Sequence, residues 1–168
     1  KNGSFRRSGY DMKKRIFWVL LLGACLAAIF FFSSQNYYQT NNTSGKISMV
    51  IVQIAKDVGA VPAGSSTAYQ AVNVCIRKIA HFTIFFLLGV NISMIVWTFG
   101  HLSNSKRLVI SLAAGFICAC GDEFHQRFVM ARTSSFRDVC IDTAGVLLAV
   151  FIVRSVEHRK HSSYPGKG

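Results

Sequence analysis

Residues able to act as acids, bases or ligands gather in one short part of this chain. Of only seven acidic residues, four lie between positions 122 and 142: Asp122, Glu123, Asp138 and Asp142. Carboxylates that meet a histidine such as His81 can act as a general acid and base. The same groups suit a hard divalent cation or zinc, although no H-E-x-x-H or similar metal spacing is present.

Four apolar stretches must position these residues. They are 16–32, 79–99, 108–121 and 139–153. A helix needs about 20 residues to cross the hydrocarbon core of a bilayer. The last two stretches are shorter, so they span a membrane only if the polar residues at their ends belong to the same helices. The sequence therefore predicts ionisable groups below the membrane surface.

The composition indicates a small basic membrane protein. Of 168 residues, 51% are hydrophobic and only 15% are charged, against about 25% charged in soluble domains. These values exclude a disordered chain, and a mean hydropathy of +0.36 argues against a soluble nucleic-acid-binding protein. No nucleic-acid partner is expected. Five cysteines without a CxxC pair indicate neither a disulfide framework nor a zinc knuckle.

The basic residues predict the direction of the chain. Lys and Arg outnumber Asp and Glu by 19 to 7, and twelve of the basic residues precede the first span, separate the second from the third, or follow the fourth. With Asp11 and Glu157 they give one side a net charge of +10. By the positive-inside rule this side is the cytoplasm. Both termini are therefore predicted to be cytoplasmic, and the acidic cluster to lie at the outer leaflet.

The predicted fold class is an all-α integral membrane bundle of four transmembrane helices, in a single domain at residues 12–158. Residues 1–11 are interpreted as an upstream extension or an expression remnant, and 159–168 as a flexible basic tail. From Ile47 to Val58 apolar residues recur at helical spacing. This pattern predicts an additional amphipathic helix that lies on the outer leaflet or caps the bundle.

Stripes of small residues lead up to the acidic residues on two of the spans. The third span carries one stripe, made of Gly115, Cys118, Ala119, Asp122 and Gln126. The fourth carries a matching stripe, made of Asp138, Asp142, Gly145 and Ala149. Small residues let helices approach closely in lipid. The carboxylates are therefore expected to face the interior of the bundle.

Two of the acidic residues also have a local structural interpretation. Ser135-x-x-Asp138 matches a capping box, in which Asp138 would only start a helix. Glu123 and Arg127 are four residues apart and could form a surface ion pair.

Other candidates have structural alternatives of a different kind. Arg132 could form a clamp with Asp122 or Asp138, and His81 could be satisfied by a backbone carbonyl. Asp142 is the hardest to explain in this way, because it lies one helical turn deeper than Asp138.

The ordered combination of these motifs resembles the VanZ-like family of small bacterial membrane proteins. The matching pieces are Phe31-Phe-Ser-Ser-Gln35, Lys78-Ile-Ala-His-Phe82, Asp122-Glu-Phe-His-Gln-Arg-Phe128, Arg132-Thr-Ser-Ser-Phe-Arg-Asp138 and Asp142-x-x-Gly145. The chain departs from the family by Asp142, where Asn is frequent, and by Met130-Ala131 in place of Pro-Gly. The resemblance implies a helical integral membrane protein. The best-known member is associated with low-level resistance to the glycopeptide teicoplanin.

Resemblance and topology together lead to one main hypothesis. Teicoplanin acts outside the membrane on peptidoglycan precursors and carries a lipid tail. An outward-facing polar pocket in the bacterial cytoplasmic membrane would bind or modify an envelope lipid or lipid-linked precursor. The residues assigned to catalysis are His81, Asp122, Glu123, Gln126 and Asp138. Those assigned to substrate binding are Lys78, Arg132, Ser135 and Asp142.

Two other function classes are considered. The protein could bind membrane lipids, a lipoglycopeptide or a cell-wall enzyme without catalysis, with the charged cluster as a structural lock. A proton-coupled transporter would need acidic residues along the whole path, which the inner halves of the spans lack. Catalysis, a divalent metal cofactor and a homodimer are left open.

Overall fold

Five helices make up almost all of the chain that the computed structural model describes. The described residues are 2–34, 37–57, 59–60, 66–99, 102–129 and 135–162. The helices are α1 (Asn2–Ser34), α2 (Tyr37–Asp57), α3 (Ser66–Trp97), α4 (Asn104–Gln126) and α5 (Phe136–Ser162). No strand occurs within these described ranges, which confirms the all-α prediction.

Four of the described helices are long and apolar enough to cross a membrane, namely Met12–Ser34, Ser66–Trp97, Asn104–Gln126 and Phe136–Arg159. The prediction of four spans is therefore confirmed, and the chain is a membrane protein. The two short apolar stretches gain the missing length at their polar ends, because α4 continues through Asp122 and α5 begins before Asp138. Helix α2 contains the predicted amphipathic pattern, and α5 runs to Ser162, into the predicted tail.

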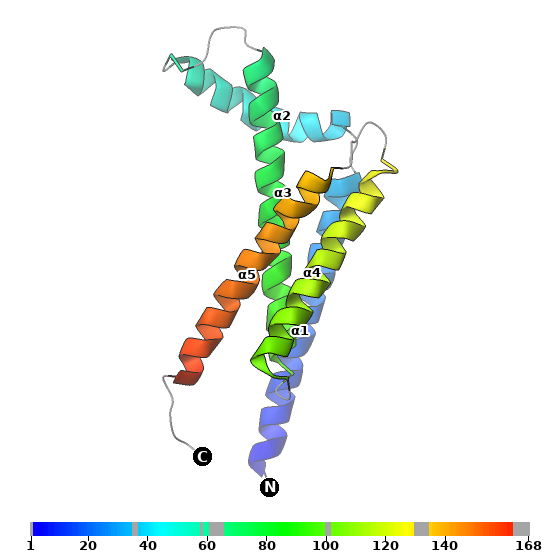
Figure 1. The fold of residues 1–168 in the computed structure, drawn as a ribbon, viewed down its shortest axis with the longest axis vertical. Coiled ribbons are helices and arrows are strands. Elements are labelled where there is room, and N and C mark those ends of the chain that lie inside the picture. The colour runs from blue at the N-terminus through cyan, green and yellow to red at the C-terminus, as the bar shows by residue number, and fades with distance from the viewer. Residues whose placement is uncertain are drawn as a thin grey trace.

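The four spanning helices form a bundle, and α2 crosses over one end of it (Figure 1). Helix α3 is central, since it contacts α1, α2, α4 and α5. Its most extensive contact is with α5, and α1 also contacts α4. The beginning of α1 and the end of α5 both lie at the end of the bundle away from α2 (Figure 1).

Glycines allow α5 to approach its neighbours closely. A Cβ atom at Gly145 would lie 2.5 Å from the carbonyl oxygen of Phe82 on α3. A Cβ at Gly89 of α3 would lie 3.0 Å from Cα of Val146 on α5. Gly115 of α4 faces the side chain of the same valine. Val146 is fully buried, so glycines of α3 and α4 close around it; Gly115 belongs to the predicted stripe of the third span, whereas Gly89 was not predicted.

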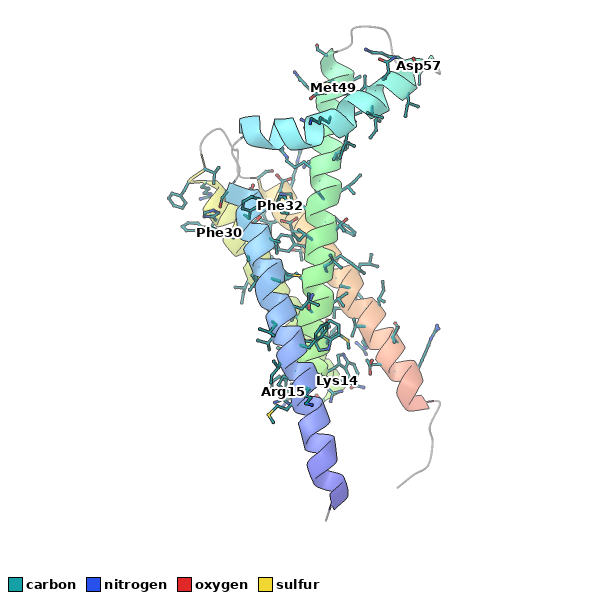
Figure 2. All side chains as sticks on the ribbon, turned by 180° about the vertical axis from the view of Figure 1, so that it is seen from behind. Lys14, Arg15, Phe30, Phe32, Met49 and Asp57 are labelled. Carbon is teal, nitrogen blue, oxygen red and sulfur yellow. The ribbon has the colours of Figure 1, made fainter. Side chains whose placement is uncertain are left out.

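At the end of the bundle away from α2, basic side chains form contacts that join the helices. Figure 2 shows Lys14 and Arg15 on α1 far from α2. The guanidinium of Arg15 donates to the Oγ1 atom of Thr98 at 3.1 Å and to its carbonyl oxygen at 3.2 Å. Arg107 lies 4.3 Å from the ring centroid of Trp97. This basic end is the one that the sequence predicts to face the cytoplasm.

Candidate functional site

Helix α3 contributes Lys78 and His81. Phe85 and Leu88 continue the face of His81 and are fully buried in the core. Their burial fixes the rotation of α3, so that the imidazole of His81 is directed toward α4 and α5. The side chain of His81 is 19% exposed and that of Lys78 is 36% exposed. The lysine therefore lies at the rim of the site and the histidine further inside.

Helix α4 places three polar side chains in a buried position at its end. Asp122, Glu123 and Gln126 are each less than a tenth exposed. The Nε2 atom of Gln126 donates to Oδ2 of Asp122 at 2.8 Å and to Oγ of Ser33 on α1 at 3.3 Å. Gln126 thus fixes the orientation of the Asp122 carboxylate and ties α4 to α1.

Ser33 is a residue of this site that the sequence interpretation did not assign. It is fully buried, and its hydroxyl accepts the second hydrogen bond of the Gln126 amide. Figure 2 shows the neighbouring Phe32 near the α2 end of α1. The sequence did contain a signal for Ser33. It is a hydroxyl residue in the last turn of an apolar helix, and it lies within the segment Phe31-Phe-Ser-Ser-Gln35 that resembles the family.

Helix α5 places Asp142 at the centre of the site. The residue is fully buried. One turn further on, Gly145 lies against the backbone of α3 at Phe82, the residue that follows His81. This backbone contact is the physical reason why Asp142 and His81 are neighbours.

His81, Asp122 and Asp142 form a cluster, which we call the triad. The Nδ1 atom of His81 lies 3.7 Å from Oδ1 of Asp142 and 4.0 Å from Oδ2 of Asp122. One ligand atom from each residue lies within 4.8 Å of the others. Neither carboxylate oxygen of Asp142 has a hydrogen-bond partner in the part of the protein that the structure describes. By its position, Asp142 therefore belongs to this cluster.

A second set of contacts forms the rim and replaces the predicted capping box. The backbone N–H of Ser135 donates to Oε1 of Glu123 on α4, although a capping box would direct it to Asp138. Asp138 instead accepts a hydrogen bond at 2.6 Å from Nζ of Lys78. The reason is that the end of α4 lies close in space to the beginning of α5, so that the Glu123 side chain reaches the N-terminus of α5. Ser135 still caps this helix, since its Oγ accepts from the backbone N–H of Arg137 at 3.3 Å.

The structure separates other residues from the triad. Glu123 is buried, so the surface ion-pair interpretation is wrong for this residue. The ring of His125 stacks on Phe30 at a centroid distance of 4.7 Å, and its Nε2 lies 3.1 Å from Oγ of Ser34. Arg132 lies outside the described residues, so the predicted headgroup contact and clamp of this arginine stay predictions.

The arrangement combines a buried interior with a partly exposed rim. Ionisable residues at membrane depth are costly, and they commonly face the bundle interior and mark functional sites. Here two buried carboxylates flank one partly exposed imidazole, and a lysine–aspartate pair lies at the edge. Such a cluster can hold a proton, transfer it or bind a cation. Together, fold and cluster define a helical membrane protein with a polar site formed by three of its spans.

The comparisons with known proteins identify the family. The family model described as VanZ/LLP1 matches residues 17–157. The match covers all four candidate spans almost completely, so the chain belongs to the VanZ/LLP1 family, and the resemblance to VanZ-like proteins is confirmed. Comparison with curated proteins and with solved structures returned no match.

Proposed function

We propose that this VanZ/LLP1 protein binds or modifies the headgroup of an envelope lipid or lipid-linked precursor. The observation that carries the proposal is the convergence of His81, Asp122 and Asp142, from three spanning helices, at one end of the bundle. A purely structural bundle core has no need of three ionisable groups, with two carboxylate oxygens that accept no hydrogen bond from the described residues. Groups of this kind are retained in membranes chiefly where a polar ligand or proton must be handled.

The rim supports an anionic headgroup as the ligand. Lys78 is 36% exposed at its side chain and keeps two ammonium hydrogens beyond the bond that it makes to Asp138. A lysine ammonium binds phosphate as a point charge. Arg132 belongs to the adjoining connection by sequence and would supply a second cation. His81, next inward, would be the group that gives or takes a proton.

The charge distribution supports an outer-leaflet site. The beginning of α1 and the end of α5 lie at the end of the bundle away from α2 (Figure 1), and by sequence these segments carry most of the basic residues that flank the first and last spans. The positive-inside rule assigns that end to the cytoplasm. The triad would then open toward the outer leaflet of a bacterial cytoplasmic membrane, where lipid-linked precursors are used and where teicoplanin acts. This placement supports the proposed contribution to teicoplanin resistance.

The test compares lipids and lipid-linked precursors in cells that carry the wild type or Asp122→Asn. Asp57→Asn, which changes an exposed acidic residue on α2, is the matched control. We expect the wild type and Asp57→Asn to change the same lipid species and to lower susceptibility to teicoplanin, and Asp122→Asn to do neither. Identical profiles and susceptibility for all three, at equal membrane abundance, would contradict the proposal.

A non-enzymatic role is the second candidate, and one observation favours it. Lys78–Asp138 joins α3 to α5, and Gln126 joins α4 to α1, so polar contacts also lock the helices together. In that case the protein would bind a lipid or partner without changing it. The presence of the wild-type protein would then leave lipid profiles unaltered, whereas susceptibility to teicoplanin would still depend on the protein.

A further inference from the structure

The distances between the side chains of the triad are longer than those between hydrogen-bonded groups. Its two histidine–carboxylate distances, 3.7 and 4.0 Å, both exceed the range of a hydrogen bond. The imidazole therefore pairs closely with neither aspartate, although both are on the same side of it. Nδ1 lies at nearly the same distance from two oxygens of different helices, as it would if all three atoms surrounded a common centre.

The charges of the triad also require compensation. The side chains of Asp122 and Asp142 are 3% and 1% exposed. Buried charges are normally paired or coordinate a metal. Asp122 receives a hydrogen bond from Gln126, but both oxygens of Asp142 are buried without a hydrogen-bond partner among the described residues. A fully buried carboxylate directed into a cluster without a donor of its own points to a cationic ligand.

We propose that His81, Asp122 and Asp142 bind one divalent cation of the Zn²⁺ or Mn²⁺ type. Around a tetrahedral ion with bonds of about 2.0–2.2 Å, two ligand atoms lie roughly 3.3–3.6 Å apart. The distances of 3.7 and 4.0 Å are close to this range, and the side chains would draw together by up to about 0.7 Å on binding. An imidazole nitrogen with carboxylate oxygens suits these ions better than Mg²⁺ or Ca²⁺, which prefer oxygen alone. Two carboxylates would neutralise the divalent charge.

Gln126 would hold one of the three ligands in place. Gln126 donates to the same Asp122 oxygen that faces His81. Hydrogen bonds of this kind orient ligating carboxylates in metal sites. Three protein ligands leave at least one coordination position open, as in catalytic zinc sites. That a headgroup oxygen would occupy this position rests on the proposed function, whereas binding of the metal itself does not.

The experiment measures metal bound by purified protein in nanodiscs, without any added lipid substrate or precursor. A tag other than polyhistidine is used, and the tail residues His158 and His161 are changed to Gln in every protein. Equilibrium dialysis against Zn²⁺ and Mn²⁺, followed by elemental analysis, gives the stoichiometry and Kd. Co²⁺ is added separately, because its visible spectrum reports the coordination geometry.

We expect one Zn²⁺ or Mn²⁺ per chain in the wild-type background, and at least about tenfold weaker binding for Asp142→Asn, Asp122→Asn and His81→Gln, each of which removes a direct ligand. Asp57→Asn and His125→Gln are the matched controls and should keep the affinity of the background. Circular dichroism and gel filtration identify any variant that does not fold.

Two results would overturn the inference: substoichiometric binding of both metals by the background protein, or unchanged affinity in the triad variants. Because the assay contains no substrate, metal binding together with identical lipid profiles and identical teicoplanin susceptibility for the wild type and Asp122→Asn would reject the proposed function alone. Altered profiles without metal binding would reject the metal alone.

Discussion

The Nδ1 atom of His81 lies 3.7 Å from Oδ1 of Asp142, although the two residues come from different helices and Asp142 is fully buried. The contact depends on the approach of α5 to α3, because Gly145, one turn beyond Asp142, lies against the backbone of α3 at Phe82. The position of the triad is therefore set by the helix packing one turn away from it, and changes in that packing should alter the distances between the triad side chains.

Gly145→Ala should destabilise the protein by about 1–3 kcal/mol, as overpacking of a close-packed interior does. The new methyl group would meet the Phe82 carbonyl oxygen at 2.5 Å, so α5 has to move away from α3. Unfolding in mixed detergent micelles measures the change. Gly121→Ala is the control, because a Cβ at Gly121 meets nothing within 4 Å. Equal stability of the two variants would show that the approach of α5 is not tight.

The same substitution should weaken metal binding by the triad without changing any ligand. Moving α5 away from α3 separates Asp142 from His81, so the Kd for Zn²⁺ should rise for Gly145→Ala and stay constant for Gly121→Ala. The dialysis measurement described above gives both values. An unchanged Kd in a destabilised Gly145→Ala protein would argue that Asp142 is positioned by other contacts.

Glu123→Ala should loosen the N-terminus of α5. It removes the acceptor for the backbone N–H of Ser135, and an unsatisfied, partly buried N–H costs about 1–3 kcal/mol. Glu123→Gln keeps an acceptor oxygen and should retain most of the stability. Hydrogen exchange of the amides at 135–139 should speed up in Glu123→Ala only. Equal exchange in both variants would mean that Glu123 does not hold this helix end.

The Lys78–Asp138 pair should contribute little to stability. Its side chains are 36% and 28% exposed, and pairs of this exposure couple by about 0.2–1 kcal/mol. A double-mutant cycle with Lys78→Met and Asp138→Asn measures the coupling energy. A much larger coupling would favour the structural-lock interpretation of the rim over headgroup binding, whereas a small coupling with lost lipid phenotype supports a functional rim.

The orientation of the bundle can be tested with cysteines placed at its two ends. In a background without the native cysteines, Asp57→Cys lies on α2 and Ser105→Cys lies at the beginning of α4, and both positions are exposed. The positive-inside rule predicts that a membrane-impermeant maleimide labels only Asp57→Cys in intact cells. Ser105→Cys should react after permeabilisation. The reverse pattern would place the triad at the cytoplasmic leaflet.

Much of the architecture could be predicted because it depends on one-dimensional patterns. Run length and helical spacing predicted four spans, an amphipathic helix and inward-facing carboxylates, and these features agree with the fold. The burial of Asp142 followed from its position one turn below Asp138. The small-residue stripes predicted that α4 and α5 pack closely, and Gly115 does lie against Val146 of α5, but they did not predict the approach of Gly145 to the α3 backbone.

The pairing of individual side chains could not be predicted in this way. Ser135 and Asp138 match a capping box locally, but Glu123 reaches the Ser135 N–H from another helix and Asp138 binds Lys78. Such choices depend on the distance between helix ends, which spacing along the chain does not encode. Ser33 was missed for the same reason, since its partner Gln126 is on a different helix.

The position of Asp142 on α5 also has a consequence for biogenesis. Of the described helices, α5 is made last and carries the fully buried Asp142, whereas its histidine neighbour lies on a helix made earlier. A carboxylate is costly in the bilayer core until it is accommodated by its neighbours. We therefore expect the integration of α5 to depend on its docking on α3, and a chain that stops before α5 to lack the third member of the triad.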